Sequence, residues 1–178
     1  SNVLATGDCP QKDVVEYCKV IQSNSDLLLR LINDILDISR LEAGKLDFVF
    51  EECNVTSLCK DTLHSIESVS ETSVKFIFNS PDPNFYLVTD IHRLQQVLLN
   101  VLSNSSKFTK EGSITLEFRI DEKERMVFFS VTDTGEGIPE GTEMLVFGRF
   151  KKLNDFIQGT GLGLAICKTI ISVLGGDI

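Results

Sequence analysis

The chain has 178 residues, 42% of them hydrophobic, a composition sufficient for a packed core and unlike that of a disordered chain. Its formal net charge of −9 disfavours nucleic acid or an anionic membrane surface as the main partner. No apolar run reaches the roughly 18 residues that a membrane-spanning helix needs. The five cysteines, odd in number and without a Cys-x-x-Cys pair, fit a reducing compartment better than disulfides or zinc.

The N-terminal part of the chain is predicted to hold a loop and one long helix. Residues 1–11 are polar and contain Gly7 and Pro10, which favour a loop. Over residues 12–43 apolar side chains recur at helical spacing, and Gly44 is a natural helix stop. The apolar face is too broad for a single neighbour, as in the helices of a bundle. We therefore expect a partner subunit, or sequence outside this chain, to cover it.

Strands and helices are mixed through the rest of the chain. Alternating apolar residues such as Phe48 and Phe50 predict strands, and apolar residues at three- and four-residue steps predict helices. The predicted elements are strands over 46–51, 74–78, 85–88, 113–120 and 126–132, and helices over 56–68, 90–109 and 161–174. The last two strands should form a hairpin. This mixture favours the α+β class, a two-layer α/β sandwich with helices on one face of a mixed sheet.

The helix predicted over 90–109 has two unlike faces. Asp90 is a good N-cap, and one face is apolar. The other face carries a column of polar side chains without any acidic residue: Arg93, Gln96, Asn100, Asn104 and Lys107. This column is either an ordinary solvated face or a face that meets an anionic ligand. In the second interpretation the asparagine amide oxygens suit Mg²⁺, and the lysine can reach a phosphate.

Two glycine-containing segments follow the central helix. Residues 133–139, Asp-Thr-Gly-Glu-Gly-Ile-Pro, are either a turn capped by Asp133 or a close approach to a flat ligand. In the second case the carboxylate could accept a hydrogen bond from an exocyclic amine, such as N6 of adenine. Residues 159–164, Gly-Thr-Gly-Leu-Gly-Leu, open the last helix, where exposed N–H groups favour phosphate. Neither the P-loop nor the Rossmann spacing is present.

The segment between the two glycine stretches, residues 141–158, is aromatic and basic. It carries Phe147, Phe150 and Phe156 together with Arg149, Lys151 and Lys152. It is either a mobile lid over phosphates or a surface loop held by aromatic anchors.

Together these stretches resemble the catalytic, ATP-binding domain of sensor histidine kinases, within the GHKL (Bergerat-fold) ATPases. Residues 98–109 resemble the N box, 133–138 the first glycine box, 147–150 the F box, 159–164 the second glycine box, and 32–46 the second helix of the dimerisation domain with its exit. The resemblance implies a partial dimerisation and phosphoacceptor domain over 1–44 and a catalytic domain over 45–178, truncated before its last strand. The departures are Gly148, where an acidic residue is common, and Ser105, where alanine is common.

The resemblance also implies roles for individual residues. Asn100, Asn104 and Lys107 would be catalytic, with Asn104 on Mg²⁺ and Lys107 on a phosphate. Asp133 would hold the adenine amine. The residues implied to bind ATP are Asn100, Asn104, Lys107, Phe108, Asp133, Gly135, Gly137, Ile138, Phe150, Gly159, Thr160, Gly161, Leu162, Gly163 and Leu164.

The function implied is that of a fragment of a longer kinase, because no His-Glu phosphoacceptor motif followed by Pro is present. Bound ATP would phosphorylate a histidine on the missing acceptor helix, for relay to an aspartate of a response-regulator receiver domain in two-component signal transduction. This fragment is not expected to autophosphorylate alone, nor to contact nucleic acid or a membrane directly. The intact kinase is expected to be a homodimer through the long helix. This fragment is expected to be cytoplasmic, and its parent protein is a candidate for anchoring in the inner membrane.

Two other functions stay open. The first is ATP hydrolysis, as in the chaperone, gyrase and mismatch-repair ATPases of the same fold. Those enzymes resemble one another in placing a glutamate where this chain has Asn100, which is a poor base for activating water. The second is a nucleotide-gated dimerisation module without phosphotransfer, in which the long helix matters most.

Overall fold

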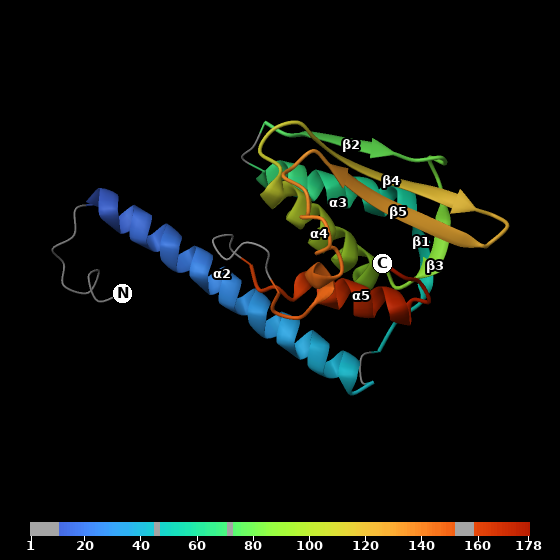
Figure 1. Ribbon diagram of the computed structural model, residues 1–178, viewed down its shortest axis with the longest axis horizontal. Coiled ribbons are helices and arrows are strands. Elements are labelled where there is room, and N and C mark those ends of the chain that lie inside the picture. Colours follow the sequence, from blue (N-terminus) through green and yellow to red (C-terminus); the bar gives the residue numbers. More distant parts are fainter. Residues whose placement is uncertain (1–10, 45–46, 71–72, 152–158) are drawn as a thin grey trace.

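The computed structural model of the chain describes residues 11–44, 47–70, 73–151 and 159–178. Two of its helices, α3 and α4, lie against a three-stranded sheet, with α5 next to them and α2 crossing α5 on the far side (Figure 1). The N-terminal half of α2 projects away from the other elements. The elements are α2 (Gln11–Glu42), β1 (Glu51–Asn54), α3 (Val55–Val69), β2 (Lys75–Asn79), β3 (Tyr86–Thr89), α4 (Ile91–Phe108), β4 (Ser113–Asp121), β5 (Met126–Asp133), the 3-10 helix η1 (Leu145–Phe147) and α5 (Gly163–Val173).

The strands form two sheets. In the larger one the order is β2-β4-β5, with β2 parallel to β4 and β5 antiparallel to it. In the smaller one β1 pairs antiparallel with β3. The predicted hairpin of β4 and β5 is confirmed, and so is the α+β class with a mixed sheet. The two strands on either side of residues 81–84, β2 and β3, belong to different sheets, so that turn does not close a hairpin.

The prediction of a strand over 46–51 is wrong. Residues 47–50 form no strand, and β1 begins only at Glu51. The backbone N–H of Val49 donates to Oδ2 of Asp90 at 3.0 Å instead of to a neighbouring strand. Phe48 packs beside α5, and its ring stacks on that of exposed Phe50 with centroids 6.4 Å apart. The alternation of apolar residues therefore arises from this aromatic contact and not from the two faces of a sheet.

Other differences concern element ends. Gln11 is helical, whereas we expected it in the N-terminal loop, and the rest of that loop lies outside the described residues. The last helix begins at Gly163, two residues later than predicted. Among the described residues, no helix is both long enough and apolar enough to span a membrane.

The first apolar cluster lies between the larger sheet and the two helices α3 and α4. Each of its buried members is at most 9% exposed. They are Cys53, Val55, Leu58, Cys59, Leu63, Val74, Leu94, Leu98, Leu102, Ile114, Leu116 and Phe118.

The second apolar cluster lies on the other side of α4, beneath α5. Its buried members are Val97, Leu162, Ile166, Cys167 and Ile170. Two residues of α2, Leu31 and Ile38, pack against it and are partly buried. Most other apolar residues of α2 are exposed, among them Val15, Val20, Ile21, Leu28, Leu29, Ile32, Ile35 and Leu36. One face of α2 is thus covered by other elements of the chain, and the rest of its apolar surface is exposed to solvent.

Candidate functional site

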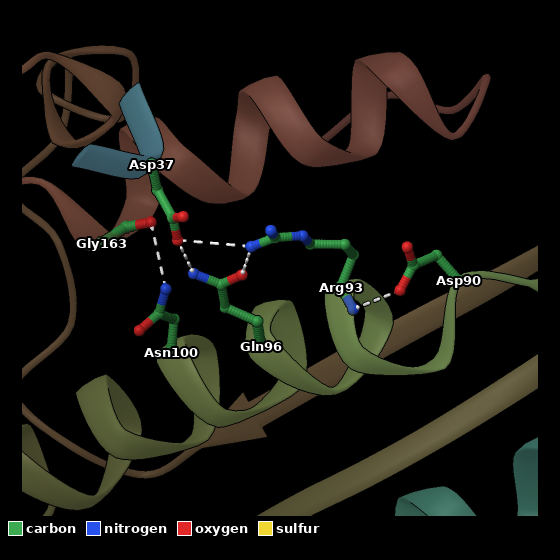
Figure 2. Close-up of polar contacts among 6 residues, drawn as sticks. All are labelled: Asp37, Asp90, Arg93, Gln96, Asn100 and Gly163. Atoms are coloured by element: carbon green, nitrogen blue, oxygen red, sulfur yellow. Dashed lines mark hydrogen bonds and ion pairs between the residues drawn. The ribbon is translucent and has the colours of Figure 1, made fainter. Parts of the chain in front are cut away.

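Helix α4 supplies the polar column that the sequence predicts. The Asp90 carboxylate caps the helix by accepting the N–H of Arg93 at 3.0 Å (Figure 2). Leu98 and Leu102 are buried in the first cluster, which turns the opposite face outward. On that face Asn100, Asn104 and Lys107 line a cavity of about 1870 Å³.

The cavity is open to solvent and is lined by segments that lie far apart in the sequence. Besides α4 they are the end of β5, the loop after it, the segment around η1, the glycine segment before α5, and α2 over residues 14–34. The lining includes the cations of Lys19, Lys107 and Lys151 and the carboxylates of Asp26, Asp34, Asp133, Glu136 and Glu143.

The loop after β5 is held against the end of α4. Asp133 ends β5, and its Oδ1 accepts the N–H of Gly135 at 2.9 Å. A Cβ on Gly135 would lie 2.5 Å from the carbonyl oxygen of Phe108, so only glycine permits this approach. Glu136 donates its N–H to the same carbonyl at 3.4 Å. The Asp133 carboxylate therefore has a fixed place at one end of the cavity.

The glycine segment before α5 forms the opposite wall. Gly161 has a φ of +70°, a left-handed conformation that favours glycine. The Thr160 hydroxyl accepts the N–H of Leu162 at 3.2 Å, which orients the start of α5. A Cβ on Gly159 would lie 4.0 Å from Nζ of Lys107, so the ammonium group lies beside this segment. The lysine ammonium group thus lies beside a glycine segment that lines the cavity and opens a helix, an arrangement that favours an anion.

Asn100 joins α4 to the first turn of α5. Its Nδ2 donates to the carbonyl oxygen of Gly163 at 3.4 Å (Figure 2). Burial raises the pKa of the neighbouring Cys167 thiol to about 11, and a hydrogen bond with Asn100 lowers it in part. Cys167 is therefore a neutral thiol at physiological pH and no candidate nucleophile.

Most of the predicted site residues meet at this cavity. Those that line it are Asn100, Asn104, Lys107, Phe108, Asp133, Gly137, Ile138, Gly159, Thr160, Gly161, Gly163 and Leu164. Gly135 supports the loop from behind, and Leu162 is fully buried in the second cluster. Phe150 is 64% exposed and lines a smaller cavity of about 370 Å³ beside α2. Phe147 lines the main cavity, while Lys152 and Phe156 lie outside the described residues.

Two carboxylates of α2, one at the cavity and one beside it, were not singled out from the sequence. Asp34 lines the cavity and accepts the Thr160 hydroxyl hydrogen at 2.9 Å. Asp37 accepts from Gln96 at 2.9 Å and pairs with Arg93 at 3.3 Å (Figure 2). In the sequence both look like ordinary polar positions of a helix, and no local pattern identifies partners so distant along the chain.

A metal ion here would take only part of its ligands from the protein. Within the described ranges, no group of three or more His, Cys, Asp or Glu side chains is placed to hold one. The oxygen-bearing amides of Asn100 and Asn104 are hard ligands and fit a Mg²⁺ ion that keeps waters or phosphate oxygens.

The known proteins that this chain resembles are histidine kinases. Residues 89–178 match the family model described as histidine kinase-, DNA gyrase B-, and HSP90-like ATPase. The chain is 34% identical to the sensor histidine kinase WalK of Bacillus subtilis, over 98% of this chain and 30% of that protein. It is 36% identical to the circadian input-output histidine kinase CikA of Synechococcus elongatus, over 92% of this chain and 22% of that protein. Thus the chain spans less than a third of either relative.

A solved structure shares the arrangement of most of the chain. Full-length ShkA, crystallised in complex with AMPPNP, superposes with a TM-score of 0.77 at 28% identity, over 90% of this chain and 34% of ShkA. The match includes the long helix as well as the sandwich, because 90% of the chain is covered.

Proposed function

The chain belongs to the histidine kinase-, DNA gyrase B-, and HSP90-like ATPases, and on that premise we propose that it binds Mg-ATP in the cavity beside α4 and donates the γ-phosphoryl group to a histidine. The phosphoryl group would then pass to an aspartate of a response-regulator receiver domain in two-component signal transduction. The observation that carries the proposal is the meeting of Asp133 and Lys107 at one cavity, with the glycine segment beside the lysine. The names of the relatives, sensor histidine kinases, support it.

Asp133 is proposed to recognise adenine. Its Oδ1 is oriented by the N–H of Gly135, and the side chain lines the cavity. A carboxylate accepts a hydrogen bond from the N6 amine of adenine and repels the O6 oxygen of guanine. Ile138, half exposed at the same wall, offers apolar surface to a flat base.

The phosphates are proposed to lie between Lys107 and the glycine segment. The lysine supplies a point charge, and the backbone N–H groups at the start of α5 favour an anion. Asn104, with Asn100 beside it, would present an amide oxygen to Mg²⁺. The ion would neutralise charge on the transferring group. Asn100 also positions α5 through its hydrogen bond to Gly163.

The acceptor histidine is proposed to come from a segment other than the described cavity wall. The chain has two histidines, His64 on α3 and His92 on α4, and neither lines the cavity. Hydrolysis is the weaker alternative, because Asn100 stands where a water-activating enzyme needs a base.

The long helix is proposed to mediate homodimerisation in the intact kinase. Its exposed apolar residues, such as Val20, Leu28 and Ile35, need a partner to leave water. On this proposal residues 1–44 belong to a dimerisation and phosphoacceptor domain, and residues 45–178 to the catalytic domain.

The test is to mix the chain with Mg-ATP labelled at the γ-phosphate, with and without a polypeptide that carries an acceptor helix. Label on the acceptor histidine supports the proposal, and it should be absent with Asn104→Ala but retained with the control Ser106→Ala, a nearby residue of α4 that does not line the cavity. Vigorous phosphate release without transfer would favour an ATPase. ATP binding with neither outcome would favour a nucleotide-gated dimerisation module.

A further inference from the structure

Helix α2 contacts the elements that carry the proposed nucleotide site through two carboxylates. Asp34 accepts the hydroxyl hydrogen of Thr160 at 2.9 Å. One turn later Asp37 contacts Arg93 at 3.3 Å and Gln96 at 2.9 Å. Arg93 and Gln96 also bond to each other at 2.8 Å, so the three side chains close a triangle (Figure 2). We call these interactions of Asp34 and Asp37 the docking contact.

The docking contact belongs to one narrow stripe of α2. Leu31 and Ile38, which flank the two carboxylates at helical spacing, pack on the second cluster. The Asp37 and Arg93 side chains are each 21% exposed, so their attraction is less screened than that of a surface pair. The stripe therefore joins α2 to the rest of the chain through few side chains.

Asp34 and Asp37 differ in their relation to the cavity. Asp34 lines it and Asp37 does not. Thr160 is part of the glycine segment that takes the phosphates in the proposed function. A carboxylate bonded to this threonine places negative charge next to the site of a triphosphate, where repulsion is stronger than in bulk water.

We propose that docking of α2 through Asp34 and Asp37 and binding of a nucleoside triphosphate oppose each other. The triphosphate loosens the docking contact, and the docking contact lowers the affinity for the triphosphate by the same factor, since coupling of two binding equilibria is reciprocal. Adenosine, which carries no phosphate, has no such conflict and leaves α2 docked. The inference rests on the proposed function, because it takes the phosphates to lie at the glycine segment.

The affinity test is calorimetry with Mg-ATP and with adenosine. Asp34→Asn should bind Mg-ATP more tightly than the wild type by about fivefold or more, with unchanged affinity for adenosine. Asp37→Asn should also tighten Mg-ATP, although Asp37 does not line the cavity, because it weakens docking alone. Asp26→Asn is the matched control: it removes the same charge from the cavity wall about two turns earlier on α2 and should have a smaller effect than either.

The docking test uses fluorescence, since the chain contains no tryptophan. In Ile38→Trp the new indole lies at the second cluster and lines neither cavity, so its emission reports on the docking of α2. Its emission should shift to the red on addition of Mg-ATP and stay unchanged with adenosine.

The possible failures are distinguishable. Tighter Mg-ATP binding by both Asp34→Asn and Asp37→Asn supports the inference. Weaker binding by Asp34→Asn, the result expected of a magnesium ligand, overturns it and leaves the proposed function standing. Unchanged Mg-ATP binding by both variants also overturns the inference and leaves the proposed function standing. Absence of Mg-ATP binding in every folded variant overturns the inference and the proposed function together.

Discussion

The first apolar cluster is closed by the larger sheet, α3 and α4, whereas the second uses α2 as one of its walls. No residue of α2 packs on the first cluster among those described, and its buried members are at most 9% exposed. In the second cluster the contributions of α2, Leu31 and Ile38, are only partly buried. The difference separates two properties of the molecule. The first cluster sets the stability of the sandwich, and the second sets how firmly the long helix lies beside the site.

Helix α4 takes part in both clusters and in the cavity. Leu98 and Leu102 face the first cluster, Val97 faces the second, and Asn100 and Asn104 face the cavity. On one side α4 packs on the tightly buried first cluster, and on the other it packs on the second cluster, to which α2 contributes. A ligand bound to α4 is therefore well placed to change the position of α2.

The largest expected effect comes from the first cluster. Leu102→Ala removes a fully buried side chain and should lower the free energy of unfolding by about 2–5 kcal/mol. Leu36→Ala on α2, where the side chain is 47% exposed, should change it by less than about 0.5 kcal/mol. Urea titration followed by circular dichroism measures both. Equal losses would contradict the contrast between buried Leu102 and exposed Leu36.

A second prediction compares two glycines of the loop after β5. Gly135→Ala places a Cβ against the Phe108 carbonyl and should push the loop from α4, which weakens Mg-ATP binding by about 1–3 kcal/mol. Gly137→Ala meets nothing within 4 Å, and its strain comes only from a φ of +71°. It should weaken binding less. A larger loss in Gly137→Ala than in Gly135→Ala, measured by calorimetry, would contradict the assigned position of the loop.

The smallest expected effect concerns how often each apolar cluster opens, as measured by the labelling of its buried cysteine. Burial raises the pKa of the Cys59 thiol, in the first cluster, to about 12 and that of Cys167, in the second, to about 11. Both are neutral at pH 8, so each should react with iodoacetamide only after its cluster opens. Cys167 should be labelled faster than Cys59 under native conditions. Leu31→Ala should accelerate labelling of Cys167 alone, as mass spectrometry can show.

The alkaline limit follows from the same two pKa values. Both folded-state values lie above the ordinary value of 9.0, so the unfolded chain ionises first as pH rises. The stabilisation from the neutral thiols is complete below pH 9 and is lost between pH 9 and about 12. Urea titrations across this range should show falling stability, with a smaller fall in Cys59→Ala. The same fall in Cys59→Ala as in the wild type would show that the buried Cys59 thiol does not cause the loss of stability.

The sequence is sufficient to predict features that depend on neighbouring residues, and insufficient to predict contacts between residues far apart in the chain. The Asp90 cap and the polar column of α4 follow from spacing alone, and the hairpin of β4 and β5 follows from alternation. The strand expected over 46–51 fails because Phe48 and Phe50 stack on each other, which periodicity cannot distinguish from a sheet face. The roles proposed for the site residues came from resemblance to a family, with chemistry as support. The contacts of Asp34 and Asp37 depend on how α2 lies on α4 and α5, which no local pattern encodes.

The most direct test of the central claim is calorimetry of the chain with ATP and GTP in the presence of Mg²⁺. We expect the wild type to bind ATP in preference to GTP, and Asp133→Asn to weaken ATP binding by about 1–3 kcal/mol. Glu136→Gln, a change at an exposed carboxylate of the same wall, is the control and should keep the preference. No heat of ATP binding by the folded wild type, or an undiminished preference for ATP in Asp133→Asn, would contradict the account.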